Sequence, residues 1–242
     1  MRRERVLPVV LLMGLGLGAC EPVEPEASGP FKTLPPGSAL PTGAECAARV
    51  RRSEWEPRPK NAQANQTRGQ SGVTVNGASA DFNQRHAARI DGDFTGTTDE
   101  IIQWGACKWG FDEDVVRAVA VVESWWRQST VGDNGASHGL LQVRSTVHTG
   151  TFPMSRDSTA YSVDYALAWR RACYEGTFTW MNGSSKLGGY AGGDEWGCVG
   201  AWYSGDWYDG SPDVAYSGAR WYIERVKARL AERTWEREDF RE

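Results

Sequence analysis

Histidine and closely spaced cysteine, the residues from which zinc sites are built, are scarce in this sequence. The chain of 242 residues contains five cysteines and three histidines. No two cysteines form a Cys-x-x-Cys pair, and His86, His138 and His148 show no metal-ligand spacing. The sequence therefore predicts no metal site, and we expect no cofactor.

An excess of positive charge is also missing. The formal net charge is −4, and removal of residues 1–19, which contain three arginines and one glutamate, lowers it to −6. Because nucleic-acid-binding domains are basic, nucleic acid is not an expected partner. Regular alternation of apolar and polar residues is missing as well, so the fold class that we expect is mainly α.

The N-terminus has the pattern of a secretory signal peptide. Arginines are followed by an apolar stretch from Val6 to Gly18, which is too short to remain as a membrane-spanning helix. The Leu-Gly-Ala sequence before Cys20 resembles the lipobox of bacterial lipoproteins, in which the cysteine is acylated; the alternative is a chance cysteine after an ordinary signal. We expect residues 1–19 to be removed and the exported protein to be anchored by a lipid on Cys20, facing the cell wall.

Composition divides the rest of the chain into three parts. Residues 20–43 are rich in Pro, Glu, Gly and Ala, which is typical of a flexible, solvated linker. Residues 44–96 are polar and irregular, and we expect them to pack as an extension on the main domain, residues 97–242. Within the extension, Asp91 begins an EF-hand-like stretch, but Ile102 occupies the twelfth position, which needs a carboxylate. The stretch is therefore interpreted as a turn.

Four cysteines remain after Cys20, an even number in a chain that we expect to be exported. This predicts two disulfides. Three connectivities are possible, and the sequence alone does not choose among them. We favour Cys46 with Cys107 and Cys173 with Cys198.

Capping residues predict helices through the main domain. Thr97 and Glu100 form a capping box for a helix that ends before Gly110, and Asp112 caps the next helix. Further helices are expected over residues 162–175, 195–203 and 212–235, the last with Tyr222 on its apolar face.

The helix that starts after Asp112 contains the most apolar run of the main domain and ends near Glu123. At about 100° per residue, Glu123 shares a helix face with Val116 and Val119. Burial raises the pKa of a carboxyl group, and a proton held near neutral pH suits a general acid. The competing interpretation is a structural ion pair between Glu123 and Arg117 or Arg127.

A second motif points to a different class of enzyme. Residues 135–139 match the Gly-x-Ser-x-Gly motif of serine hydrolases, with Ser137 as the nucleophile. That motif needs a preceding strand and an acid before a later histidine. Here a helix and a polar turn precede it, and no acid lies between Ser137 and His148. We therefore do not expect a serine hydrolase.

Glu123-Ser124 and the later segment Gly139-Leu140-Leu141-Gln142-Val143 form a pattern in two parts. The pattern resembles the lysozyme-like lytic transglycosylases with a soluble-lytic-transglycosylase domain, in which a helix ending in Glu-Ser precedes a Gly-Leu-Met-Gln segment. Residues 201–205, Ala-Trp-Tyr-Ser-Gly, are similar to the family's Tyr-Asn-x-Gly stretch, with Ser204 as a departure. The resemblance covers residues 97–235 and implies a lysozyme-like helical domain.

The resemblance also implies an activity. It is cleavage of the β-1,4 bond between N-acetylmuramic acid and N-acetylglucosamine in peptidoglycan, with Glu123 as both acid and base and a 1,6-anhydromuramic product. Ser124, Ser137, Gln142 and Tyr203 are the expected substrate-binding residues. Twelve tryptophans fit sugar recognition, because aromatic faces stack on sugar rings; we expect about one third of them in a groove.

Two alternatives lead to different products. A hydrolytic muramidase needs a second carboxylate, for which Asp194, Glu195, Asp206 and Asp209 are candidates, and releases reducing ends. A non-catalytic lipoprotein binds the wall through its tryptophans and releases nothing. In all three cases the expected partners are glycan strands and a membrane, and the protein is expected to be a monomer.

Overall fold

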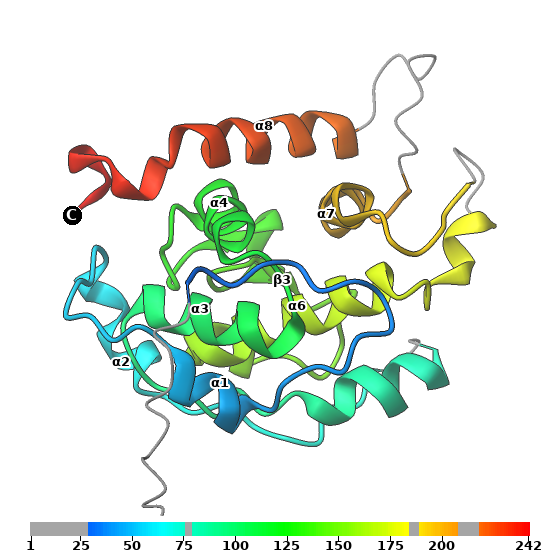
Figure 1. The fold of residues 1–242 in the computed structure, drawn as a ribbon, viewed down its shortest axis with the longest axis horizontal. Helices are drawn as coiled ribbons and strands as arrows, with labels where there is room; N and C mark the ends of the chain where they lie inside the picture. Colours follow the sequence, from blue (N-terminus) through cyan, green and yellow to red (C-terminus); the bar gives the residue numbers. More distant parts are fainter. Residues whose placement is uncertain (1–28, 76–78, 184–188, 208–217) are drawn as a thin grey trace, which may run out of the picture.

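Helices make up most of the computed structural model, which describes residues 29–75, 79–183, 189–207 and 218–242. The chain is 54% helical and 3% strand, so the prediction of a mainly α fold is confirmed. The helices surround a central pair, and the longest outer helix crosses one side (Figure 1). Among the described residues, no helix has the length and apolar character needed to span a bilayer.

The centre of the fold is formed by two helices whose residues are all buried, α3 (Thr98–Trp109) and α6 (Thr159–Tyr174). A side chain at Gly105 of α3 would collide with Val163 of α6, because an added Cβ would lie 2.4 Å from it. Glycine at this position therefore lets the two helices pack closely. The predicted capping box of α3 and its end at Gly110 are confirmed.

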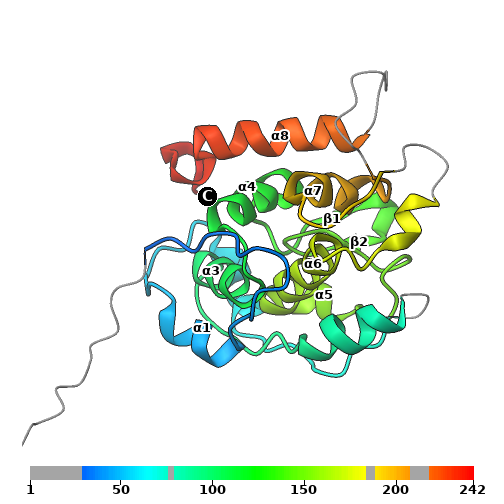
Figure 2. The ribbon, with the colours of Figure 1, turned by 45° about the vertical axis from the view of Figure 1, so that its right-hand side comes forward.

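A second group of helices lies on one side of this pair: α4 (Glu113–Ser124), α7 (Glu195–Ser204) and α8 (Gly218–Glu232). Both views show α8 extending over α4 and α7 (Figures 1 and 2). Gly200 of α7 allows the approach of α8, because an added Cβ would lie 2.8 Å from Ile223. The predicted start of the last helix at residue 212 lies outside the described residues, and α8 ends three residues before the predicted end.

A small antiparallel sheet, which the sequence did not predict, follows α4. It consists of β1 (Val131–Gly132), β2 (Ser137–His138) and β3 (Val143–Arg144), paired in chain order. Val131 faces His138, and His138 faces Val143. Strands of two residues are too short to show a period of two, so sequence periodicity could not reveal them.

The shorter helices are mostly in the N-terminal extension and at the C-terminus. The α-helical ones are α1 (Gly43–Arg49), α2 (Ala62–Asn65) and α5 (Met154–Asp157). The other helical turns are Pro59–Asn61, Phe82–His86, Ala87–Arg89, Asp133–Gly135, Thr179–Asn182, Thr234–Glu236 and Glu238–Phe240. Residues 44–96 are thus more helical than predicted.

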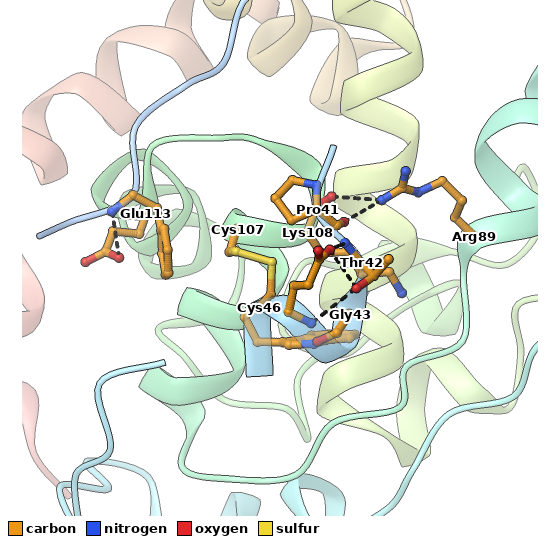
Figure 3. Close-up of a disulfide and its surroundings, with 11 residues drawn as sticks. Pro41, Thr42, Gly43, Cys46, Arg89, Cys107, Lys108 and Glu113 are labelled. Atoms are coloured by element: carbon orange, nitrogen blue, oxygen red, sulfur yellow. Dashed lines mark hydrogen bonds between the residues drawn. A yellow bond between two sulfur atoms is a disulfide. The ribbon is translucent and has the colours of Figure 1, made fainter. Parts of the chain in front are cut away.

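Both favoured disulfides are confirmed. Cys46 of α1 bonds to Cys107 of α3, and Cys173 of α6 bonds to Cys198 of α7. Figure 3 shows the first of them beside Gly43, whose carbonyl accepts a hydrogen bond from the indole of Trp104 at 3.0 Å. Two disulfides are typical of a protein exported to an oxidising compartment.

The segment before α1 packs on the domain instead of forming a solvated linker. Phe31 is buried and its N–H donates to Glu113 at 3.2 Å, while the buried Arg171 donates to the carbonyls of Leu34 and Pro35 at 2.9 and 2.8 Å. The linker prediction is therefore wrong for residues 29–42. Their composition suggested solvation, but it could not show that a buried guanidinium uses their carbonyl oxygens as acceptors.

Candidate active site

The candidate site is a groove of about 600 Å³ between the small sheet and helices α7 and α8. The end of α4 forms part of its lining through Val122 and Glu123. Its acidic lining residues are Glu123, Asp133 and Asp206, and its arginines are Arg144 and Arg225. The groove therefore brings together residues from α4, the three strands, the Asp133–Gly135 turn, α7 and α8.

Glu123 is partly exposed in the groove but is held among apolar and aromatic side chains. Its Oε1 accepts a hydrogen bond from the hydroxyl of Tyr222, ninety-nine residues later on α8. Burial raises the pKa of Glu123 to about 8, and the negative charge of Asp133 acts in the same direction. Hydrogen bonds from Tyr222 and Trp202 oppose the rise only in part. The carboxyl group is therefore protonated at neutral pH.

The end of α4 is fixed by bonds on the side away from the groove. Ser124 is buried, and its hydroxyl donates to the carbonyl of Leu140 at 2.8 Å. Trp125 and Trp126 both have left-handed backbone angles, with φ of 56° and 60°, which reverse the chain directly after the helix. The buried Trp126 indole donates to the carbonyl of Arg117 at 3.0 Å. These contacts hold Glu123 at one position and in one direction.

The two arginines that could have paired with Glu123 have other partners. Arg117 is buried and bonds to Asp99, Glu113 and Asp114, with shortest distances of 2.7 Å. Arg127 bonds to Glu242 at 2.6 Å. The ion pairs of Arg117 lie beside a separate cavity of about 720 Å³ near the N-terminal end of α4, and Glu123 does not line this cavity. The structural ion-pair interpretation of Glu123 is therefore wrong.

The sheet side of the groove carries Asp133, Ser137 and Gln142. The Ser137 hydroxyl donates to Asp133 at 2.6 Å. The Gln142 amide donates to the carbonyls of Thr130 and Gly139 at 3.0 and 2.8 Å, so its side chain supports the turn that begins this wall. Asp133 and Gln142 have φ of 48° and 50°, a left-handed conformation that is uncommon for such residues.

The opposite wall is aromatic. Tyr203 stacks on Tyr222 with ring centroids 4.8 Å apart and 8° between the planes, and 49% of its surface is exposed. Trp202 stacks on His148 at 5.1 Å and donates to the carbonyl of Leu141 at 3.1 Å. Burial lowers the pKa of His148 to about 4, so its imidazole is neutral at pH 7. This wall offers two exposed rings to a ligand, those of Tyr203 and of Trp221, which is 42% exposed.

Most of the predicted site residues lie together in the groove. The groove is lined by four of them, Glu123, Ser137, Gln142 and Tyr203. It is also lined by Ser204, the residue that differs from the family's Tyr-Asn-x-Gly pattern. Ser124 does not line it, so the prediction that Ser124 binds substrate is wrong: its hydroxyl joins α4 to the Leu140 turn.

The predicted second carboxylates have different environments. Asp206 lines the groove. Asp194 caps α7, where it accepts from the N–H of Gly197 at 2.8 Å, and Glu195 accepts from the hydroxyl of Thr33 at 2.9 Å. Neither of these two residues faces Glu123. Asp209 and the predicted lipidation site Cys20 lie outside the described residues.

Fewer tryptophans reach the groove than the sequence suggested. Only Trp202 and Trp221 line it, whereas one third of the twelve was expected. Nine of the other ten belong to the core or to its margin, including the fully buried Trp104, Trp109 and Trp126, and Trp180 is 50% exposed outside the groove. High tryptophan content therefore reflects packing more than sugar binding.

Sequence reasoning missed several groove residues, above all Tyr222 and Asp133. Tyr222 was recognised only as part of an apolar helix face, since nothing in the sequence indicates a contact with Glu123. Asp133 is ten residues after Glu123 in a polar turn, and its left-handed conformation carries no clear sequence signal. Arg144, His148 and Arg225 were missed for the same reason: they reach the groove through tertiary structure.

Comparisons with known proteins give no assignment. No protein-family model, no curated protein and no solved structure matches the chain. The groove and its residues are therefore the basis on which a function can be assigned.

Proposed function

We propose that the protein is a lysozyme-like lytic transglycosylase of peptidoglycan. The observation that carries the proposal is the protonated carboxyl group of Glu123 in a groove, in hydrogen-bond contact with Tyr222. Because Tyr222 donates to Oε1, the other oxygen of Glu123 can hold the acid proton. A general acid with a pKa near the working pH is effective at protonating a leaving oxygen.

The proposed reaction uses Glu123 twice. Glu123 first protonates the glycosidic oxygen, and the bond from that oxygen to C1 of the muramic residue breaks. The carbonyl oxygen of the sugar's own N-acetyl group stabilises the positive charge at C1. The Glu123 carboxylate then takes the proton of the C6 hydroxyl while O6 bonds to C1, which yields a 1,6-anhydro end, consumes no water and restores the acid.

One observation favours hydrolysis as the second candidate. Asp133 lies in the same groove, and its charge acts on Glu123. A carboxylate placed across the sugar could activate a water molecule, which would attack C1 and leave a reducing end. The two reactions share the acid and differ in what attacks C1.

We also propose that the enzyme works outside the cytoplasm, held to a membrane by a lipid on Cys20. The pattern before Cys20 and the two disulfides support export. A lipid anchor needs no membrane-spanning helix and places the groove near the cell wall. A non-catalytic wall-binding protein would have no need for a protonated carboxyl group in its groove, which favours catalysis over binding alone.

Replacement of Glu123 by glutamine tests the proposal. Gln has nearly the same shape and cannot supply a proton, so release of soluble muropeptides from isolated walls should fall by at least about 10³-fold. Glu224→Gln is the matched control, because Glu224 is exposed on α8 and does not line the groove. Circular dichroism should show that both variants are folded. Unchanged release by Glu123→Gln would contradict the proposal.

A further inference from the structure

A guanidinium group at the groove is held in place without an anionic partner among the residues that the structure describes. Arg225 lies one helical turn after Trp221 on α8, and its Cζ is 4.6 Å from the centre of the Trp221 ring. Trp221 packs in turn against Tyr203, with ring centroids 5.7 Å apart. Within the described part of the chain, no carboxylate bonds to Arg225. Its N–H groups are therefore available to a ligand.

An arginine against an aromatic ring is well suited to bind a carboxylate. Cation–π contact limits the movement of the side chain without using its N–H donors. The planar guanidinium can then form two parallel hydrogen bonds to the two oxygens of a carboxylate. Because the side chain is already restrained by Trp221, little conformational entropy is lost when the ligand binds.

The charge of the molecule indicates why such a cation is needed. The expected mature chain has a formal net charge of −6, and the groove also contains Asp133 and Asp206. A negatively charged ligand is repelled by this field unless cations are placed where its charge will lie. Within the described ranges, Arg225 on α8 and Arg144 on β3 are the two arginines that line the groove.

We infer that Arg225 binds a carboxylate of the peptide stem carried by muramic residues, so that the enzyme prefers glycan strands that keep their stems. This inference depends on the proposed function, and it adds a substrate preference and the residue that sets it. The exposed face of Tyr203 is available for sugar stacking, and Arg225 adjoins it through Trp221. A strand whose sugar lies on Tyr203 therefore has its acidic substituent near the guanidinium.

The test compares two forms of one substrate. Soluble glycan strands with intact stems are divided, and half are stripped of peptide by an amidase. The lactyl carboxylates that the amidase exposes are then blocked as neutral amides with a carbodiimide and methylamine, so that the stripped strands carry no carboxylate. The wild-type protein should cleave the stemmed strands with a kcat/KM about tenfold higher, the effect of one charge-assisted contact. Arg225→Gln should raise KM about tenfold on stemmed strands and leave stripped strands unaffected. Arg225→Lys, which keeps the charge but not the paired bonds, should fall between them.

Two further variants separate the possible outcomes. Lys227→Gln removes a cation from the same helix outside the groove and should keep the tenfold preference. The inference is overturned if the wild type cleaves both strands equally, if Arg225→Gln slows both equally, or if only Arg144→Gln removes the preference. In those cases the proposed function survives, because strands are still cleaved. If the wild type cleaves neither strand, both proposals fail.

Discussion

At the scale of single residues, the main feature of the protein is the contact between Tyr222 and Glu123. Burial and the charge of Asp133 raise the pKa of Glu123, and hydrogen bonds from Tyr222 and Trp202 lower it, with a resulting value of about 8. Above this pH the carboxyl group is ionised and cannot donate a proton. Activity should therefore fall about tenfold for each pH unit above 8.

Removal of the Tyr222 hydroxyl should change this dependence in a defined direction. In Tyr222→Phe the ionised carboxylate loses a donor, so the pKa of Glu123 rises and the acid form persists to higher pH. The alkaline limb of the pH profile of kcat/KM should move upward by about one pH unit, since a hydrogen bond to a charged group contributes roughly 1.5–3 kcal/mol.

Tyr203→Phe is the control, because it keeps the ring stacked on Tyr222 and removes a hydroxyl that has no bond to Glu123. Its alkaline limb should not move. A limb that stays in place in Tyr222→Phe, or moves to lower pH, would show that Glu123 is not the group that titrates.

The place of Glu123 on the apolar face of a helix could be predicted from the sequence, because that face is set by the spacing of nearby residues. Its place at the end of an apolar helix follows from the spacing of Val116 and Val119, and that helix is confirmed as α4. Tyr222 could not be assigned a role in the same way, since its contact with Glu123 joins residues far apart in the chain. Asp133 was missed because its position depends on an unusual backbone angle.

At the scale of elements, the groove depends on how α7 and α8 are held against the central helices. The disulfide Cys173–Cys198 joins α6 to α7, the helix that carries Trp202 and Tyr203. The disulfide Cys46–Cys107 joins α1 to α3 and does not touch the groove. The two bonds should therefore have different effects on activity.

Replacement of each cysteine pair by serine should separate stability from substrate binding. Closure of loops of 61 and 25 residues stabilises a protein by about 4 and about 3 kcal/mol, so both variants should unfold at lower temperature in calorimetry. Only loss of Cys173–Cys198 should also raise KM on glycan strands, because α7 is then free to shift. An equal rise of KM in both variants would contradict the role given to α7.

The helices were predicted well where caps mark their ends. Thr97 with Glu100 and Asp112 were identified from sequence and cap α3 and α4 in the structure. For α6 the predicted start was three residues late, because the true cap, Ser158, precedes Thr159, which is not a strong helix former. Contacts between helices, such as the close approach of Ile223 to Gly200, could not be predicted, because no short stretch of sequence indicates which helices pack together.

At the scale of the whole molecule, we propose a lipid-anchored protein whose acidic domain contains a groove that shields Glu123 from most solvent. The N-terminal segment packed along α3, α4 and α6 attaches the domain directly to the chain that leads from Cys20. With the proposed lipid on Cys20, this packing would keep the groove close to the membrane surface. The fold class could be predicted from the absence of strand patterns, whereas the groove could not, because it is assembled from distant segments.

The most direct test of the central claim is the mass of the products. Isolated cell walls are digested with the wild-type protein, and the soluble muropeptides are measured by mass spectrometry. We expect muramic ends in the 1,6-anhydro form, each lighter by one water than the reducing form, because O6 of the sugar attacks C1. Reducing ends would instead identify a hydrolase that uses Asp133 or another carboxylate, and the absence of soluble products would contradict catalysis altogether.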